Sequence, residues 1–410
     1  MSTSALIAIC LVLAQGAKPA IARDRLPSEL SALSDEEVAR IARMSPLPAL
    51  APDPTNRFAE NEDAATLGHR LFFDTRLSPK GVSCATCHDP ARYFTDGKPL
   101  AQGVGTARRN APTVVDAARR RWNGWDGKFD SIWSQALSPL ENPVEMGGSR
   151  AQLHAVVRGD PALRALYEKA FGPMPEAASD ATTANLLKSL GAYQRRLLSP
   201  EAPIDRLVAA LKGEAGGSLD ALSPAARRGL ATFVSKGGCY QCHRGPSFTD
   251  EEFHALGLAG ANGKVPDDPA RLAAVEFVQA NPFNAAGAFS DAPRSPRAAM
   301  VRGLRRSGEL FGQFRTPSLR GVALTPPYMH DGRAASLDDV ARFYDTLEGA
   351  SPIGHHGESV LAPIGLGDAG RTDLVAFLRA LTPEPPTGTG GWWHPPEVAG
   401  SEGQSAPSGR

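Results

Sequence analysis

The 410-residue sequence lacks a net charge, because 44 Lys and Arg residues balance 44 Asp and Glu residues. Proteins that bind nucleic acid show a basic excess or a basic stripe, so this composition argues against that class. Long apolar runs are also missing. The run at 5–14 has ten residues, whereas a helix that spans a bilayer needs about 20. We therefore expect no nucleic-acid partner and no membrane span.

Alternation of apolar and polar residues, which indicates half-buried strands, is almost absent from the sequence. Gly (41) and Pro (35) make up nearly one residue in five, which predicts long irregular connections and excludes a coiled coil or a helical repeat. Helical spacing recurs along the chain, so the sequence predicts a mainly α protein. We expect helices near 35–44, 62–73, 130–137, 149–172, 180–198, 223–236, 269–279, 336–348 and 370–381.

Cysteines are few, and their odd number, five, leaves one without a partner. That one, Cys10, lies in the apolar run, which ends in Ala20-Ile21-Ala22, a small-residue pattern typical of signal-peptide cleavage. No Lys or Arg precedes the run, which departs from the usual signal. We interpret 1–22 as a signal peptide and expect a periplasmic protein. The other four cysteines form two Cys-x-x-Cys pairs, which suits an oxidising compartment.

A histidine follows each of these pairs. The first motif consists of Cys84, Cys87 and His88, and the second of Cys239, Cys242 and His243. Cys-x-x-Cys-His is the pattern of haem c attachment, with the histidine as proximal iron ligand. Zinc ribbons place their Cys pairs about 15–20 residues apart, and a thioredoxin-like site needs a βαβ context. A disulfide would not explain a histidine that follows twice. The motifs therefore predict two covalently bound haem c groups.

The surroundings of the two motifs are duplicated. Gly68 and Phe72 precede the first motif and Phe94-Thr95-Asp96 follows it. Gly229, Phe233 and Phe248-Thr249-Asp250 take the same places around the second. Two related domains follow from this repeat. We divide the chain into a signal peptide (1–22), a Pro-rich segment (23–56), an N-terminal domain (57–212), a Gly/Ser-rich linker (213–222), a C-terminal domain (223–382) and a disordered tail (383–410).

From about residue 60 to 382, the chain resembles the bacterial di-haem cytochrome c peroxidase family, including its MauG-like branch. The residues that carry the resemblance include Leu71-Phe72-Phe73-Asp74, Arg109-Asn110-Ala111-Pro112-Thr113, Trp125-Asp126-Gly127, Gln135-Ala136, Pro139, Asn142-Pro143-Val144-Glu145-Met146, Phe314-Arg315-Thr316-Pro317-Ser318-Leu319-Arg320, Ala323–Gly332 and Arg342-Phe343-Tyr344. The resemblance implies two cytochrome c-like domains. It also implies that the haem on His88 binds peroxide and the haem on His243 stores and relays an electron.

The resemblance also assigns roles to individual residues. Trp125 matches a tryptophan between the haems, and Glu145 matches a distal carboxylate that suits the general acid and base needed to cleave peroxide. Gln135 matches a distal glutamine, and we expect it to be the hydrogen-bond partner of Glu145. A calcium ion between the domains would take the side chain of Asn110 and the carbonyls of Thr325 and Pro327. The basic run 119–121 could contact a haem propionate, but a solvated face is the interpretation that we favour.

The axial ligands expected at the two haems differ from those of many family members. At the first haem a usual ligand is missing, and at the second the matching residue is the one found in the MauG-like branch. Residues 89–109 contain no histidine, whereas many peroxidases of the family use one there as a ligand of the resting peroxidatic iron. We therefore expect an open or water-bound first haem. Tyr344 matches the distal ligand of the relay haem in MauG-like members, and Met329 is the competing candidate. A phenolate would lower the potential of that haem.

Three functions remain in competition. The first is periplasmic reduction of hydrogen peroxide with electrons from a small c-type cytochrome or cupredoxin. The second is MauG-like oxidation of a partner protein at long range with peroxide. The third is a di-haem electron carrier without catalysis, which requires both irons to have two protein ligands. A homodimer is compatible with the sequence, which does not name the electron donor.

Overall fold

The computed structural model describes residues 21–260, 266–351, 361–386 and 390–396, so nearly all of the expected signal peptide lies outside the described residues. The fold is mainly helical, as predicted. Strands β1 (Phe253–His254) and β2 (Phe314–Arg315) pair antiparallel. In the described part of the chain, no helix combines the length and the apolar character needed to cross a membrane. The helices are α1 (Asp35–Ala42), α2 (Glu62–Phe73), α3 (Cys84–Cys87), α4 (Ile132–Gln135), α5 (Leu137–Glu141), α6 (Arg150–Gly159), α7 (Pro161–Phe171), α8 (Asp180–Gln194), α9 (Pro203–Lys212), α10 (Pro224–Val234), α11 (Arg271–Ala280), α12 (Pro296–Gly303), α13 (Leu337–Thr346) and α14 (Gly367–Arg379).

Local capping explains where several helices begin. Helix α1 starts after Ser34, which forms a reciprocal capping box with Glu37. The predicted helix 149–172 is instead two helices, because the Asp160 side chain accepts hydrogen bonds from two backbone amides of the next turn. Pro161 then takes the first position of α7, where its missing N–H costs nothing. Sequence spacing alone did not reveal this break.

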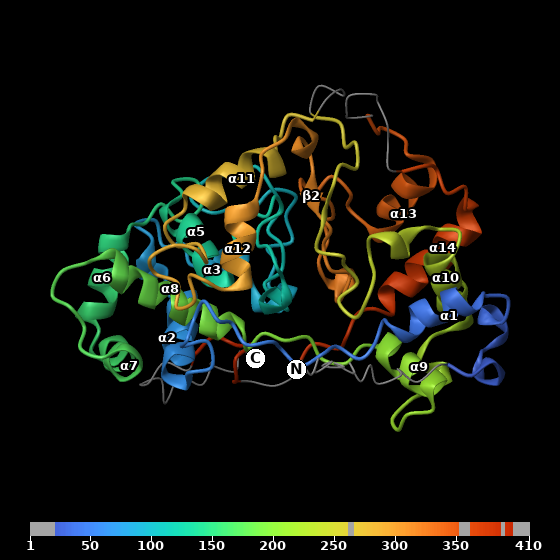
Figure 1. The fold of residues 1–410 in the computed structure, drawn as a ribbon, viewed down its shortest axis with the longest axis horizontal. Helices are drawn as coiled ribbons and strands as arrows, with labels where there is room; N and C mark the ends of the chain where they lie inside the picture. The colour runs from blue at the N-terminus through green and yellow to red at the C-terminus, as the bar shows by residue number, and fades with distance from the viewer. Residues whose placement is uncertain (1–20, 261–265, 352–360, 387–389, 397–410) are drawn as a thin grey trace, which may run out of the picture.

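The first lobe, on the left in Figure 1, is built on a close crossing of α2 and α8. A Cβ atom at Gly68 would lie 1.9 Å from the Ser189 carbonyl oxygen, so only glycine permits this approach. Phe72 then packs against Tyr193 of α8, with 5.1 Å between the ring centroids. The duplicated Gly-x-x-x-Phe pattern therefore marks a helix crossing.

The second lobe, on the right in Figure 1, repeats this arrangement with α10 and α14. A Cβ atom at Gly229 would lie 2.0 Å from the Asp373 carbonyl oxygen. Phe233 packs against Phe377 of α14, with 5.0 Å between the centroids. Each Cys-x-x-Cys-His motif follows the first helix of such a crossed pair, after residues 74–83 in the first lobe and after residues 235–238 in the second.

The boundary between the lobes differs from the predicted one. Helix α9 lies within the expected N-terminal domain, but its residues Ile204, Leu207 and Leu211 are buried in the core of the second lobe. Ile41 of α1 is buried in the same core, so part of the segment 23–56 also belongs there. The assignment of 57–212 to one domain is therefore wrong at its end. Motifs located the lobes, but tertiary packing decided where these helices lie.

Helices α11 and α12 belong to the second half of the sequence but cover the first lobe (Figure 1). Val278 and Val301 pack on Trp122 in a small apolar cluster. The buried carboxylate of Asp130 accepts a hydrogen bond of 2.7 Å from the Ala285 amide. The two halves of the chain are therefore interlocked and do not simply follow one another in space.

The predicted disordered tail is wrong for residues 390–396, which pack on the first lobe. The Tyr193 hydroxyl donates to the Trp392 carbonyl at 3.0 Å. The His69 Nε2 atom lies 2.7 Å from the His394 carbonyl. Proline and glycine richness suggested disorder, but two adjacent tryptophans supply enough apolar surface to hold this short stretch against α2 and α8.

Candidate haem sites

The first motif forms the short helix α3 and its C-cap His88, whose ring lies 6.3 Å from the ring of Phe72 in the core of the first lobe. The His88 Nδ1 atom lies 3.1 Å from the Phe94 carbonyl oxygen. Burial lowers the pKa of the imidazole, so His88 is neutral and Nδ1 carries the donated proton. A neutral imidazole that donates through Nδ1 leaves Nε2 as a metal ligand, which is the usual arrangement of a ligating histidine.

The second motif repeats this geometry. The His243 Nδ1 atom lies 3.0 Å from the Phe248 carbonyl oxygen, and burial lowers the pKa of this imidazole as well. Both accepting residues have positive φ angles, 59° at Phe94 and 50° at Phe248. The duplicated Phe-Thr-Asp is therefore the turn that orients each histidine.

A further pair of equivalent contacts extends the duplication. The Thr113 hydroxyl donates to the Tyr93 carbonyl at 2.6 Å, and the Ser318 hydroxyl donates to the Ser247 carbonyl at 2.7 Å. Each acceptor immediately precedes the Phe of its turn. Pro112-Thr113 and Pro317-Ser318 are therefore equivalent parts of the two sites. Sequence reasoning missed this equivalence. A local alignment of Arg109–Thr113 with Arg315–Ser318 could have found them.

All four motif cysteines are free thiols and carry no disulfide. Burial raises the pKa of Cys84 and of Cys239 to about 12, and that of Cys87 to about 11. These three groups are therefore neutral thiols at physiological pH. None of these four described cysteines forms the disulfide that was the alternative to haem attachment.

A cavity of about 890 Å³ opens beside the second motif. Its walls include His243, Tyr344, Met329 and Trp125, so both candidate distal ligands face the same space as the proximal histidine. Burial, followed by the nearby Cys239 and Cys242, raises the pKa of the Tyr344 phenol. The volume lies in the range of cofactor sites, about 300–1,000 Å³.

Cationic groups line this cavity without a full set of partners. Burial lowers the pKa of Arg120 to about 10, and the like charge of Arg315 adds to this effect. Arg315 pairs with the Glu251 carboxylate at 3.0 Å through one nitrogen, but its buried Nε atom has no hydrogen-bond partner. Buried guanidinium groups need anions, and the two carboxylates of a haem are suitable. The residues present therefore fit the group that the motif predicts, and the favoured solvated face is wrong for Arg120, while Arg121 is 42% exposed and pairs with Glu252.

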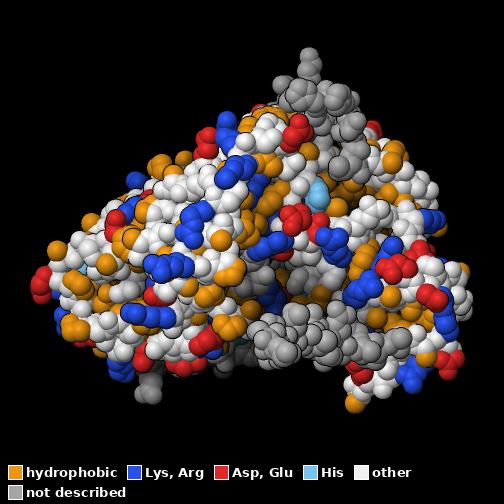
Figure 2. Space-filling model, in the orientation of Figure 1, with side chains coloured by type: hydrophobic (Ala, Val, Ile, Leu, Met, Phe, Trp, Pro, Cys, Tyr) orange, Lys and Arg blue, Asp and Glu red, His pale blue; other side chains and the backbone are white. Residues whose placement is uncertain are grey.

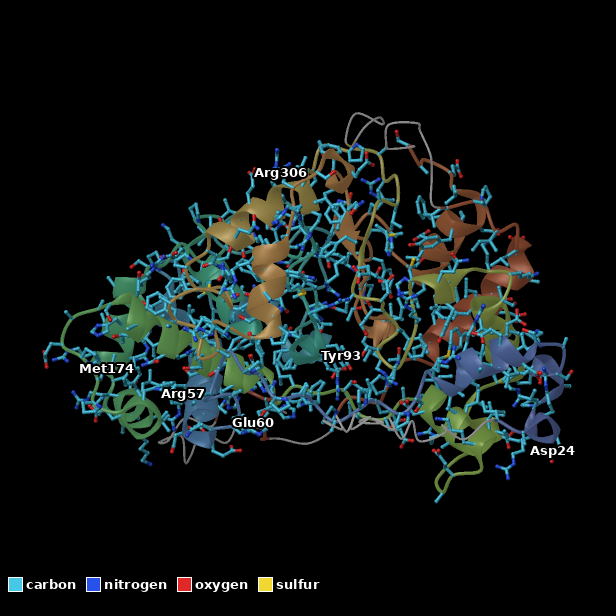
Figure 3. All side chains as sticks on the ribbon, in the orientation of Figure 1. Asp24, Arg57, Glu60, Tyr93, Met174 and Arg306 are labelled. Carbon is cyan, nitrogen blue, oxygen red and sulfur yellow. The ribbon has the colours of Figure 1, made fainter. Side chains whose placement is uncertain are left out.

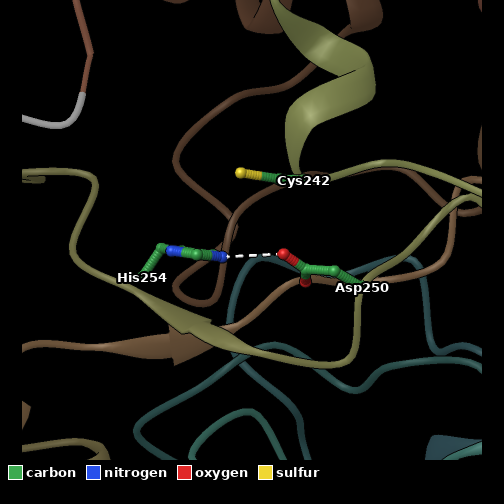
Figure 4. Close-up of side chains that lie close together, drawn as sticks. All are labelled: Cys242, Asp250 and His254. Atoms are coloured by element: carbon green, nitrogen blue, oxygen red, sulfur yellow. Dashed lines mark hydrogen bonds and ion pairs between the residues drawn. The ribbon is translucent and has the colours of Figure 1, made fainter.

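Figure 4 shows a polar cluster on the rim of the second site. The His254 Nε2 atom lies 3.0 Å from the Asp250 Oδ2 atom, and the Cys242 sulfur lies within 4.8 Å of the ligand atoms of both. Hydrogen bonding to the Cys242 thiol and to Asp250 raises the pKa of His254 to about 9. A structural zinc site takes four ligands, whereas this cluster offers three. One of these three is a motif thiol, so haem attachment explains it better.

The first site carries a carboxylate beside its motif. The Cys87 sulfur lies 3.5 Å from the Gln102 carbonyl oxygen, and the amide of Val104, two residues further on, donates to the Glu145 carbonyl, so Glu145 lies next to the first motif. Asp96 and Glu145 both add to the burial that raises the pKa of the Cys87 thiol. The Glu145 Oε1 atom accepts a hydrogen bond of 2.5 Å from the Asn142 side-chain amide. The Glu145 carbonyl accepts from Val104 at 2.8 Å, close to Gly103, where a Cβ atom would lie 2.2 Å from that oxygen. The loop around Gly103 therefore holds Glu145 in place.

Comparison with known proteins agrees with this geometry. A sequence model of the di-haem cytochrome c peroxidase family matches residues 62–214. The chain is 33% identical to cytochrome-c peroxidase IdrP1 of Denitromonas iodatirespirans, over 86% of this chain and 89% of that protein. It is 32% identical to the methylamine utilization protein MauG of Methylorubrum extorquens, over 93% and 95% of the two chains. This chain belongs to the di-haem cytochrome c peroxidase family.

Solved structures of the family show the same fold. A MauG-like protein associated with microbial copper homeostasis superimposes with a TM-score of 0.62 at 30% identity, over 82% of this chain and 95% of that one. The di-haem peroxidase BthA of Burkholderia thailandensis also gives 0.62, at 26% identity over 83% and 89%. The expectation of an oxidoreductase of the cytochrome-c peroxidase type is confirmed, and its family implies haem c as cofactor.

The residues that the family resemblance singled out are only partly brought together. Trp125 lines the second cavity, and its indole donates to the Asn110 carbonyl at 3.0 Å. Asn110, Thr325 and Pro327 line the same cavity. Gln135 ends α4, but Asn142 takes the place expected for Gln135 as hydrogen-bond partner of Glu145. Asn142 is nearer because it belongs to the same turn as Glu145, which only the folded loop reveals.

Proposed function

We propose that this protein is an exported di-haem peroxidase, with one haem on each Cys-x-x-Cys-His motif, that reduces hydrogen peroxide with electrons from a small redox protein. The observation that carries this proposal is the asymmetry of two sites that are otherwise equivalent. A carboxylate stands beside the first motif, and two candidate axial ligands face the second. A site without a second protein ligand can bind a small molecule, whereas a site with two transfers electrons.

Glu145 is the proposed general acid and base of the first site. Reduction of one peroxide molecule consumes two electrons and two protons and yields two water molecules. The haem iron supplies the redox chemistry when it is bound. The Glu145 carboxylate would take a proton from one peroxide oxygen and deliver it to the other, so that the leaving group is water. Asn142 donates to Oε1, which orients the carboxylate and leaves Oε2 for the proton.

The second site is proposed to store and relay an electron. Tyr344 is the proposed distal ligand, with Met329 as its competitor, and both line the same cavity as His243. Trp125 is the proposed route from this site toward the first motif. Its backbone carbonyl accepts from the Arg315 amide at 2.8 Å, so the tryptophan is fixed to the wall of the second cavity. A fixed position keeps the transfer distance constant.

The proposed electron donor is a small c-type cytochrome or cupredoxin that docks on a local patch. Acidic and basic side chains are interspersed over the face in Figure 2, and the chain has no net charge. Strong long-range steering toward a charged partner is therefore not expected. A signal peptide at 1–22 would place both proteins in the periplasm.

A second candidate is oxidation of a partner protein with peroxide, as in MauG-like proteins. Tyr344 favours it, since this residue stands where MauG-like members carry their distal tyrosine. Similarity to MauG over almost the full length also favours it. Both candidates use the same first site and differ only in the source of the electrons.

Steady-state turnover separates these candidates. We expect the purified holoprotein to oxidise two equivalents of reduced small c-type cytochrome or cupredoxin per peroxide, over many turnovers. Slow donor oxidation together with covalent oxidation of a co-purified protein would favour the MauG-like function. Failure of peroxide to react with either haem would contradict both.

Calcium is proposed to bind between the lobes, held by the Asn110 side-chain oxygen and the carbonyls of Thr325 and Pro327. The Asn110 amide nitrogen already donates to the Lys98 carbonyl at 2.9 Å, so its oxygen is the atom available to a cation. Oxygen ligands of this kind suit Ca²⁺. Elemental analysis should find about one Ca²⁺ per chain, and Asn110→Ala should lose it. A metal content unchanged by the substitution would contradict the site.

A further inference from the structure

The C-terminal segment 390–396 lies directly behind the turn that orients His88. Trp393 packs edge-on against Phe94, with 5.5 Å between ring centroids and an interplanar angle of 74°. It also contacts Tyr93 at 5.6 Å. The Phe94 carbonyl is the acceptor of the His88 Nδ1 hydrogen bond. A residue of the distant C-terminus therefore touches the group that holds the proximal histidine.

This turn needs support from outside. Tyr93 and Phe94 have φ angles of 54° and 59°, in the left-handed region that residues other than glycine seldom adopt. Such a conformation persists only where the surrounding structure holds it. Tyr93 lies between the two lobes (Figure 3), and its buried hydroxyl has no hydrogen-bond partner. The turn therefore depends on packing against its aromatic rings.

In the second site, a different residue covers the equivalent turn. The Arg320 guanidinium lies over the Phe248 ring at 5.7 Å, and its Nε atom donates to the Pro246 carbonyl at 2.6 Å. Arg320 follows Ser318 by two residues. The residue two positions after Thr113, its counterpart in the first site, is Val115, which has no charged or hydrogen-bonding side chain. Phe94 and Phe248 each pack on the phenylalanine of their own crossed helix pair, at 6.2 Å from Phe72 and 6.3 Å from Phe233, so the first turn lacks only the guanidinium cover of the second.

We propose that Trp393 is a positioning residue for His88, and that the C-terminal segment gives the first haem site the support that Arg320 gives the second. Three contacts carry this proposal together: the ring of Trp393 on Phe94, the Tyr193 hydroxyl on the Trp392 carbonyl, and His69 on the His394 carbonyl. The proposal rests on the proposed function only in that it requires a haem on His88. A firm Nδ1 hydrogen bond makes the imidazole a stronger donor to iron.

The direct test compares Trp393→Ala, Trp393→Phe and wild type as full-length holoproteins. We expect Trp393→Ala to raise the reduction potential of the first haem and to lower its iron–histidine stretching frequency in resonance Raman spectra. The second haem of the same molecule serves as internal control and should not change. Trp393→Phe, which keeps a ring against Phe94, should restore most of both shifts. An unchanged first haem, or equal shifts of both haems, would overturn the proposal.

Two controls separate this test from failure of the proposed function. A haem assay on each variant must give two haems per chain; a smaller number in the wild type would count against the proposed function and not against Trp393. Hydrogen exchange of the peptide that contains His88–Thr95 does not depend on haem, and it should rise in Trp393→Ala. Phe277→Ala removes an aromatic side chain that is 46% exposed on α11, and it should leave that peptide unchanged. Equal exchange in wild type and Trp393→Ala would overturn the proposal even without haem.

Discussion

The two Cys-x-x-Cys-His sites share the frame that orients the histidine and differ in the side chains that stand around the rest of each site. Both place Nδ1 about 3 Å from the carbonyl of a left-handed Phe. Beyond this frame, the first site has Glu145 beside its motif, and the second has a large cavity faced by Tyr344 and Met329. The repeat therefore keeps the frame that orients each histidine, whereas the side chains that face the two sites differ.

The repeated acidic residue shows how small such a change can be. Asp96 accepts hydrogen bonds from the backbone amides of Lys98 and Gln102, so it closes a loop. Its counterpart Asp250 accepts the equivalent bond from the Glu252 amide, but its other oxygen pairs with His254 beside the second cavity. The same position in the repeat therefore closes a loop in one lobe and joins a polar cluster in the other. Equivalent sequence positions therefore do not imply equivalent chemistry.

The largest expected effect comes from removing one pair of thiols. Cys84→Ala with Cys87→Ala should halve the haem content and abolish peroxide reduction, because the first haem is the one expected to react. Cys239→Ala with Cys242→Ala should also halve the haem content but leave a haem that still reacts with peroxide in stopped-flow mixing. A haem assay and peroxide consumption measure both. Peroxide turnover in the first double variant would reverse the assignment of the two sites.

Loss of the Glu145 carboxylate should have the next largest effect. Glu145→Gln should slow the reaction of the protein with peroxide by about 10²–10⁴-fold, because general acid–base catalysis contributes roughly that much. Glu141→Gln is the matched control, since Glu141 lies four residues earlier and pairs with Arg150 at the exposed surface. Stopped-flow absorbance measures both rates. Equal rates in the two variants would remove Glu145 from the mechanism.

Arg320, which covers the turn at Phe248 in the second site, forms a buried ion pair with Asp205. A substitution of Asp205 therefore tests how firmly that turn is held. The two bonds measure 2.7 and 2.8 Å, and both side chains are almost fully buried. Asp205→Asn should cost about 3–5 kcal/mol of unfolding free energy, because it leaves a buried charge unpaired. The pair of Arg228 with Asp373 is equally bidentate but lies at the surface, where the Arg228 side chain is half exposed, so Asp373→Asn should cost far less unfolding free energy. Denaturant unfolding measures the unfolding free energy of both variants. Similar losses in the two would show that burial of the Arg320–Asp205 pair does not add to its effect on stability.

The same pair predicts how stability depends on pH. Burial alone would raise the pKa of Asp205, but the hydrogen bonds and charge of Arg320 lower it overall. A carboxylate with a depressed folded pKa stabilises the fold above its unfolded pKa, about 3.9, and loses this contribution as the pH falls through the folded value. Wild type should therefore lose more stability in acid than Asp205→Asn. Parallel pH profiles would contradict this role for Asp205.

Much of the site could be predicted from the sequence because its signals are local. The haem motifs, the Phe-Thr-Asp turns and helix 62–73 depend on residues that are near one another in the chain. What sequence reasoning missed depends on contacts across the molecule. Helix α9 joins the second core, Asn142 replaces Gln135 beside Glu145, and Trp393 returns to the first turn. None of these contacts leaves a periodic pattern, so only the folded chain reveals them.

Low-temperature EPR of the ferric holoprotein as isolated tests the difference between the two sites most directly. A haem held by His88 alone should give a high-spin signal, and a haem held by His243 with Tyr344 or Met329 should give a low-spin signal. We expect one of each, in equal amounts. Two low-spin haems would contradict an open first site, and with it every role proposed for Glu145.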